Sequence, residues 1–278
     1  MDDREARPHA RLHSDPFDTR DFDDATRFAI MRMTVLGGGG AWPTPERGCS
    51  GYLIEEAGFG LLIDPGYATM PRLLDIVPAH GVDAVVVSHG HPDHCADLNP
   101  LLRARHLSDD PPPPLPVFAL GGALDAVLAL DGPMFAEGED YVIHEFAGGD
   151  RLEIGPFQLV TRWLRHFLPN VGLRLDVGGS AMAYTGDGGA DPDIVALAAG
   201  VGLLLAEATF PEHVPEEFEG LLGSACQAGE YASAARAGRL VLTHLWPGTD
   251  PDAAVGAASR SFDGPISVAR PGLRAEIA

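Results

Sequence analysis

The chain has 278 residues, of which 40 are acidic and 19 are basic, so its formal net charge is −21. All of the basic residues are arginines, and the lack of lysine excludes a lysine nucleophile, a Schiff base and a P-loop lysine. An acidic chain of this kind is a poor general binder of nucleic acids, because phosphate contacts need positive charge. The length and the 45% hydrophobic content suit one large α/β domain or two small ones.

Cysteine usage and hydropathy predict the cellular compartment. Cys49, Cys95 and Cys226 are far apart and odd in number, which argues against a disulfide framework and for a reducing environment. No apolar run is long enough to cross a membrane, and the N-terminus lacks a signal-peptide pattern. We therefore expect a cytoplasmic protein without membrane contact.

Residues 1–30 differ from the rest of the chain. They have mixed charge, few apolar side chains and no clear period, which predicts a flexible extension before a domain of residues 31–278. The first elements predicted in that domain are a strand, a glycine turn, a hairpin, a helix and another strand, at residues 32–36, 37–40, 52–63, 70–76 and 82–87.

The remaining elements are helices and strands, with several strands in succession at residues 141–186 and alternation of helix and strand from Pro192. Helices are predicted at residues 98–106, 124–130, 194–199, 227–237 and 251–261. Strands are predicted at residues 117–120, 141–143, 157–163, 171–175, 181–184, 201–206, 240–243 and 266–269, and the last of these closes the chain. Each half of the domain is rich in strands and then βα-like, so we expect two sheets packed together with helices outside.

Four candidate metal ligands directly follow the apolar strand that ends at Val87. His89, His91, Asp93 and His94 lie within six positions, and imidazoles with a carboxylate are the donors that zinc prefers. His89 and His91 can share one ion, while Asp93 and His94 can turn to a second. The alternative is a solvated polar loop, but such a loop seldom carries this density of ligands after a buried strand.

Three later residues extend this constellation. His166, Asp187 and His244 each follow an apolar run, at the strand ends where α/β folds place their sites. Taken singly, each is as well explained as a core-edge histidine or a turn aspartate. Together with the first four ligands, they favour a metal site.

The motif H-G-H-P-D-H, followed by these three residues, resembles the metallo-β-lactamase superfamily of metal-dependent hydrolases from about Met33 to the C-terminus. The resemblance implies an α/β four-layer αββα sandwich with two divalent metal ions at one rim. Zn²⁺ is the expected metal, with Mn²⁺ or Fe²⁺ as alternatives. In the implied assignment, one ion is held by His89, His91 and His166, the other by Asp93, His94 and His244, and Asp187 bridges the two.

The implied chemistry is hydrolysis by a metal-bridging hydroxide. Two cations lower the pKa of a shared water and offset charge on the attacked group. Asp93 is the candidate catalytic residue, because it can orient the hydroxide or take its proton. Asp64 and Glu207 are expected behind the ligands, where a carboxylate fixes an imidazole tautomer.

Further motifs are similar to the tRNase Z-like branch of the superfamily. They are L-L-L-A-E-A-T-F at residues 203–210, L-T-H-L-W-P-G and S-G-Y-L-I-E. The length resembles that of bacterial cyclic-nucleotide phosphodiesterases of this branch. Only 21 residues separate His166 from Asp187, too few for the tRNA-clamping arm of that branch, which with the net charge argues against tRNA as a partner.

These motifs do not identify the residue that protonates the leaving group. Leu221 and Ala206 stand where the branch has histidines, and His213 is either a substitute in space or part of a proline-rich surface loop. Trp163, Phe167 and Trp246 flank ligands, either as pocket residues or in ordinary strand packing.

The leading hypothesis is a dinuclear metal-dependent hydrolase, a phosphodiesterase for a small substrate such as a cyclic nucleotide. The alternatives are an ester, lactone or thioester hydrolase of the same superfamily, and a non-catalytic metal-dependent binding protein. On the resemblance alone, a homodimer is an alternative to a monomer.

Overall fold

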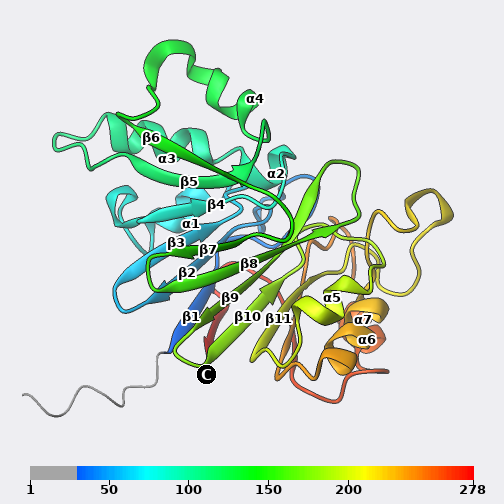
Figure 1. Cartoon of the computed structure of the whole chain (residues 1–278). Coiled ribbons are helices and arrows are strands. Elements are labelled where there is room, and N and C mark those ends of the chain that lie inside the picture. The colour runs from blue at the N-terminus through cyan, green and yellow to red at the C-terminus, as the bar shows by residue number, and fades with distance from the viewer. Residues whose placement is uncertain (1–29) are drawn as a thin grey trace, which may run out of the picture.

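The computed structural model describes residues 30–278, so the predicted extension of residues 1–30 lies, apart from Ile30, outside the described residues. Two seven-stranded mixed sheets stack face to face, and helices cover the outer face of each (Figure 1). This arrangement is the predicted four-layer αββα sandwich, and the fold prediction is confirmed. Among residues 30–278, no helix has the length and apolarity needed to cross a membrane.

Both sheets combine antiparallel and parallel pairs. The first sheet contains, in spatial order, β14 (Arg274–Ile277), β1 (Met31–Val35), β2 (Tyr52–Glu56), β3 (Phe59–Ile63), β4 (Ala84–Val86), β5 (Leu115–Leu120) and β6 (Tyr141–Phe146). The second contains β13 (Ile266–Val268), β12 (Leu240–Thr243), β11 (Leu203–Glu207), β10 (Ser180–Tyr184), β9 (Asn170–Val177), β8 (Phe157–Leu164) and β7 (Arg151–Ile154). The parallel strands β3–β6 and β10–β13 direct their carboxyl ends toward one rim of the sandwich.

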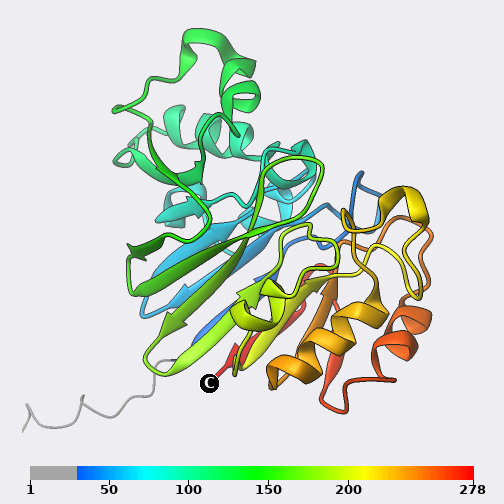
Figure 2. The same ribbon diagram turned by 45° about the vertical axis from the view of Figure 1, so that its right-hand side comes forward.

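The helices divide between the two sheets. The first sheet carries α1 (Met70–Leu74), α2 (Pro92–Cys95), α3 (Leu98–His106) and α4 (Asp125–Leu128), with the 3₁₀ helices η1 (Ala79–Gly81) and η2 (Ala129–Met134). The second carries α5 (Asp193–Leu197), α6 (Ala225–Ala235) and α7 (Pro251–Ala258), and η3 (Glu216–Phe218) lies in the loop between β11 and α6. Figure 2 shows α6 and α7 side by side, where Gly229 lets the backbone of α7 approach closely.

Three apolar cores hold the four layers together. The largest lies between the sheets and contains side chains such as Met33, Ile63, Leu173 and Leu205. The other two lie between each sheet and its own helices. Because residues alternate between the two faces of a strand, a strand covered on both faces is buried along its whole length, as β10 and β11 are.

The chain does not close with the strand that begins at Ile266. A turn around Gly272 carries it to the other sheet, where β14 pairs antiparallel with β1. Four residues of alternating burial are too short a pattern to predict as a strand. Their pairing depends on β1, which lies some 240 residues earlier in the chain.

The helix predicted at residues 124–130 is shorter than expected. The α-helical part ends at Leu128, and a 3₁₀ helix with a kink follows. Gly132 has a positive φ of 56°, and Pro133 cannot donate a backbone hydrogen bond, so a regular α-helix cannot continue there.

A close backbone approach at Gly66 fixes the turn after β3 beside α2. A Cβ atom at Gly66 would overlap the backbone carbonyl of Asp93. We expect Gly66→Ala to lower the free energy of unfolding by about 1–3 kcal/mol, as overpacking does. Gly256→Ala is the matched control, because it lies in α7 with no heavy atom within 4 Å of the added methyl group.

Chemical denaturation of both variants measures this difference. Alanine is the better helix former, so Gly256→Ala should be neutral or stabilising. Equal stability of the two variants would contradict the steric argument.

Candidate metal centre

The loop after β4 and the first turn of α2 carry four of the candidate ligands. His91 is the N-cap residue of α2, and Pro92 occupies the first helical position, where its missing N–H costs nothing. The helix start then turns Asp93 and His94 inward, and both side chains are buried. The remaining candidate ligands, His166, Asp187 and His244, follow β8, β10 and β12.

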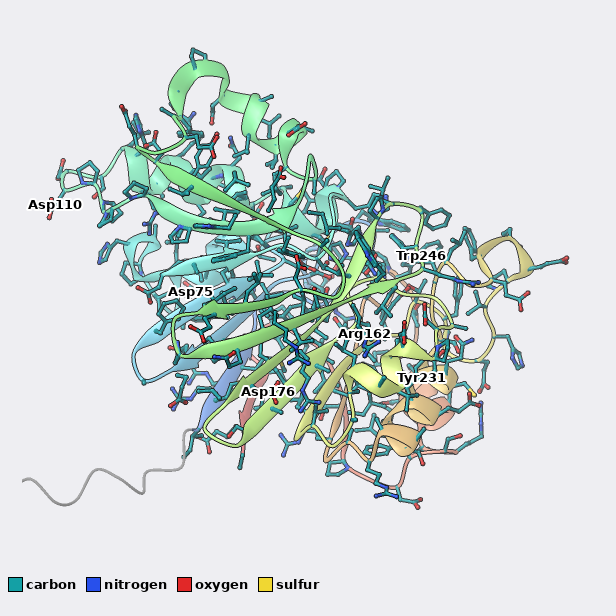
Figure 3. All side chains as sticks on the ribbon, in the orientation of Figure 1. Asp75, Asp110, Arg162, Asp176, Tyr231 and Trp246 are labelled. Carbon is teal, nitrogen blue, oxygen red and sulfur yellow. The ribbon has the colours of Figure 1, made fainter. Side chains whose placement is uncertain are left out.

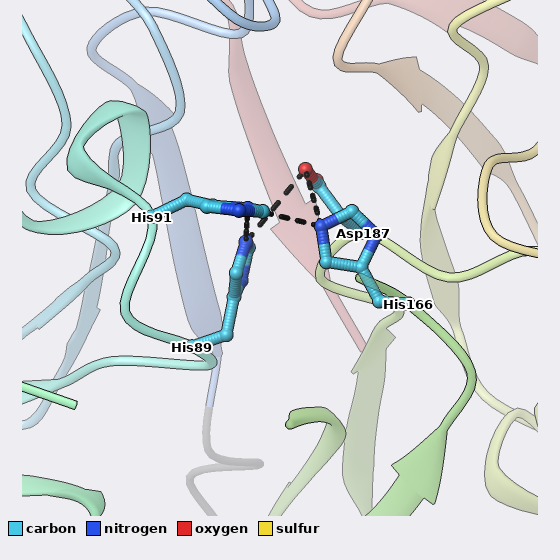
Figure 4. A group of neighbouring side chains, drawn as sticks. All are labelled: His89, His91, His166 and Asp187. Carbon is cyan, nitrogen blue, oxygen red and sulfur yellow. Dashed lines mark hydrogen bonds and ion pairs between the residues drawn. The ribbon is translucent and has the colours of Figure 1, made fainter. Parts of the chain in front are cut away.

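The first group of ligands consists of three imidazoles and one carboxylate. His91 Nδ1 lies 3.0 Å from both His89 Nε2 and His166 Nε2. Asp187 Oδ2 lies 3.8 Å from each of those Nε2 atoms. Figure 4 shows the four side chains pointing toward one another.

The second group lies on the other side of Asp187. His244 Nε2 is 3.0 Å from Asp187 Oδ2 and 3.3 Å from Asp93 Oδ2. His94 Nε2 is 3.2 Å from Asp187 Oδ1 and 3.7 Å from Asp93 Oδ2. Within each group the ligand atoms all lie within 4.8 Å of one another, and Asp187 belongs to both groups.

The donor atoms fit divalent metal ions. Nitrogens that bind zinc at 2.0–2.1 Å in a tetrahedron are about 3.3 Å apart, close to the spacing of the three imidazoles here. Among the described residues, His94 Nε2 and Asp187 Oδ1 are buried without a hydrogen-bond partner. Because an unpaired buried polar atom is costly, a cation bound by the second group, to which both atoms belong, would satisfy them.

Asp64 fixes His94 from behind. Its carboxylate accepts hydrogen bonds from the Ser88 N–H at 2.7 Å, Ser88 Oγ at 2.6 Å, His94 Nδ1 at 2.8 Å and the Tyr184 hydroxyl at 2.8 Å. With Nδ1 donating to Asp64, His94 presents Nε2 to the ligand group. The residue itself has a positive φ of 47°, a strained conformation that the four hydrogen bonds offset.

Two other histidines are fixed in the same way. His166 Nδ1 donates to the backbone carbonyl of Leu221 at 2.9 Å. His244 Nδ1 lies 2.9 Å from Thr209 Oγ1, which donates in turn to Glu207 Oε1 at 2.7 Å. Glu207 therefore acts on His244 through Thr209, a residue that the sequence analysis missed because its position beside His244 is set only by the pairing of β11 with β12.

The two groups differ in protonation. Burial lowers the pKa of His89, His91 and His166. Burial also disfavours charge on His94 and His244, but the neighbouring carboxylates, above all Asp187, outweigh it and raise the pKa of His244 to about 10.

The carboxylates respond in the opposite direction. Burial raises the pKa of Asp187 and Asp93, but the charges of His94 and His244 outweigh it and hold both pKa values below 3.8. Burial and the charge of Asp187 raise the pKa of Glu207 to about 8.

A hollow of about 240 Å³ opens over the ligands. Its lining consists of Ala41, His91, Asp93, His166, Phe167, Asp187, Phe218, Leu222, His244 and Trp246. Of the three aromatic residues that flank ligands in the sequence, Phe167 and Trp246 line the pocket. Trp163 instead packs against Gly148 outside it. Ala41, Phe218 and Leu222 had no sequence signal, because no local pattern shows that their segments meet over the ligands, even though Leu222 is next to Leu221.

The positions considered for a proton donor lie outside this hollow. His213 is exposed and does not line it, and Ala206 packs between the second sheet and its helices. Leu221 contributes its carbonyl to His166, while the neighbouring Leu222 presents an apolar side chain to the hollow.

Comparison with known proteins decides the family. The family model of the β-lactamase superfamily domain matches residues 60–245. The chain belongs to the metallo-β-lactamase superfamily. Together with the cluster of histidines and aspartates, this identifies it as a metal-dependent hydrolase of that superfamily.

Several known proteins are similar to this chain along most of their length. The probable metallo-hydrolase YhfI of Bacillus subtilis is 29% identical over 87% of this chain and 98% of its own. The crystal structure of YhfI superposes with a TM-score of 0.81 at 28% identity, covering 89% of this chain and 99% of YhfI. Rv1339 of Mycobacterium tuberculosis is 33% identical over 85% of this chain and 88% of its own. Ribonuclease Z of Methanopyrus kandleri is 30% identical over 88% of this chain and 97% of its own.

The raised pKa of His244 predicts a pH-dependent stability for chelator-treated protein. Stabilisation from His244 is complete below its unfolded pKa of 6.5 and is lost as the pH rises through about 10. Stabilisation from Asp187 is present above its unfolded pKa of 3.8 and is lost as the pH falls. Because metal binding must release the histidine protons, the increase in Tm on adding Zn²⁺ should be larger at about pH 8.5 than at about pH 6. Calorimetric scans test this, and an increase that is the same at both pH values would contradict it.

The hydrogen bonds of Asp64 predict a role in metal affinity. We expect Asp64→Asn to weaken Zn²⁺ binding about 10–100-fold, because the variant loses a carboxylate acceptor for His94. Asp97→Asn is the matched control, since Asp97, which is part-buried, likewise accepts backbone hydrogen bonds but contacts Thr69 and Met70 instead of a ligand. Competition with a chromophoric chelator measures the affinities, and equal losses in both variants would refute the assignment.

Proposed function

We propose that this chain is a phosphodiesterase for a small substrate such as a cyclic nucleotide, with two Zn²⁺ ions held by the seven ligands described above. The observation that carries the proposal is the sharing of Asp187 by two ligand groups. When bound, two divalent ions at such a site lower the pKa of water and offset charge on a phosphoryl oxygen.

Asp93 is the proposed catalytic residue. The backbone N–H of Ala41 donates to Asp93 Oδ2 at 2.8 Å, and the carboxylate lines the hollow beside His244. This fixed orientation lets Asp93 align an attacking water and accept its proton. Asp64, Thr209 and the Leu221 carbonyl hold the imidazoles in place.

A relative and the shape of the site support a small phosphodiester. The 30% identical relative from Methanopyrus kandleri is named a ribonuclease, and RNA is linked by phosphodiester bonds. In this chain, residues 165–169 connect β8 directly to β9, so no arm extends from this side of the pocket. The net charge of −21 and the hollow of about 240 Å³ also suit a small substrate better than a polynucleotide.

A second candidate is the hydrolysis of an ester, a lactone or a thioester. Apart from the ligands, the hollow is lined by Ala41, Phe167, Phe218, Leu222 and Trp246, which have no titratable proton. Such a pocket favours leaving groups that depart without protonation, and a thiolate is one of these.

Activity assays test the proposal. Zn²⁺- or Mn²⁺-loaded protein should hydrolyse cyclic AMP or bis(p-nitrophenyl) phosphate, and Asp93→Asn should lower kcat about 100-fold or more. Asp263→Asn, an exposed aspartate in the turn after α7, is the matched control and should keep full activity. Turnover of lactones or thioesters without turnover of either diester would replace the leading proposal with the second.

A further inference from the structure

Aromatic side chains form a continuous cluster beside the ligands. The aromatic cluster consists of Trp42, Phe167, Phe210, Phe218 and Trp246. Ring centroids are 6.3 Å apart for Phe167 and Phe218, 5.9 Å for Phe218 and Trp246, and 6.2 Å for Trp246 and Trp42. Phe210 packs on both Phe218 and Trp246. Figure 3 shows Trp246 near the segment that follows β11.

The two ends of the aromatic cluster are exposed. Trp42 is 52% exposed to solvent and Phe167 is 51% exposed. Trp42 follows Ala41, which holds Asp93 of the second ligand group, and Phe167 follows His166 of the first group. Exposed aromatic surface is costly in water and marks a binding site when it borders a functional pocket.

Trp246 carries an unpaired donor. Among the described residues, its indole Nε1 is buried and has no hydrogen-bond acceptor. Trp246 lines the hollow over the ligands and also a second hollow of about 210 Å³, which Trp42, Thr44 and Arg47 line as well. Because this nitrogen is not exposed, Trp246 offers the two hollows the carbon surface of its ring and not a hydrogen-bond donor.

We propose that the aromatic cluster binds the planar heterocyclic ring of the substrate, a nucleobase, while the phosphodiester lies over the ligands. This inference rests on the proposed function. Bases stack on aromatic side chains through their faces, so the cluster needs no sequence-specific contact to hold one. The hollows suit a single ring system, and the acidic chain disfavours a polynucleotide. The competing occupant is the same cluster of a second copy of this chain.

A binding experiment separates the ring from the phosphate. Metal-loaded protein is titrated calorimetrically with adenosine 5′-monophosphate and with ribose 5-phosphate, which has the same phosphate and no base. The wild type should bind the nucleotide at least tenfold more tightly. Trp42→Leu, Phe167→Leu and Trp246→Leu should each reduce this ratio about fivefold or more, because each removes a ring from the aromatic cluster.

Trp163→Leu is the matched control. Trp163 is the one tryptophan of the sequence outside the aromatic cluster, and its exposure of 48% is similar to that of Trp42. Its replacement should leave the ratio of the two affinities unchanged. An equal effect of Trp42→Leu and Trp163→Leu would overturn the proposal.

A kinetic experiment tests the same ratio during turnover. We expect kcat/KM for cyclic AMP to exceed that for the 3′,5′-cyclic phosphate of methyl riboside, which lacks the base, and the preference to fall in Trp42→Leu and Phe167→Leu. Equal turnover of both substrates would overturn the inference and leave the phosphodiesterase intact. No turnover of either, with base-dependent binding retained, would support the ring site and reject the phosphodiesterase.

Sedimentation velocity addresses the competing occupant. If Trp42→Leu converts a dimer into a monomer without changing the affinity ratio, the aromatic cluster is an interface between copies and the proposal is wrong. A sedimentation coefficient that is unchanged in the variants, together with a reduced ratio, supports the ring site.

Discussion

The buried carboxylate of Asp187 is the constraint on which the centre depends. It is 2% exposed and lies between the two ligand groups, so its negative charge must be compensated inside the protein. His94 and His244 approach it within 3.2 Å and supply that compensation when they are protonated. The same geometry suits cations in place of the protons, because a bound cation also compensates the buried carboxylates.

Two buried tyrosines connect the sheets behind this centre. Tyr184 of β10 donates to Asp64, which follows β3 of the other sheet. Tyr52 of β2 and Thr243 of β12 share a hydrogen bond of 2.6 Å, and the two tyrosine rings meet edge to face. A buried polar group tolerates little displacement, because a broken hydrogen bond there is not replaced by water. These contacts therefore fix how the sheets face each other, and with that the distance between ligands that arrive from different sheets.

The pocket separates charged side chains from apolar ones. Its floor carries the ligands and their protonation equilibria, while its walls are alkyl and aromatic side chains. An apolar wall lowers the local dielectric and strengthens every electrostatic interaction at the floor. Loops supply much of these walls, including Ala41, Phe167 and Trp246.

The sequence by itself predicted the donor atoms and their local setting. His89, His91, Asp93 and His94 stand together after an apolar strand, and strand patterns placed His166 and His244 at strand ends. These features are local, since a run of β-branched residues and the ligands after it are both read within one short window.

Only the tertiary structure decided which side chains from distant segments meet. It brought the Ala41 N–H to Asp93 and Thr209 to His244, and it placed Phe167 in the pocket and Trp163 outside it. It also carried β14 across to pair with β1. The reason is physical: periodicity records which face of an element is buried, whereas partners on loops are chosen by the packing of two sheets whose contacts span most of the chain.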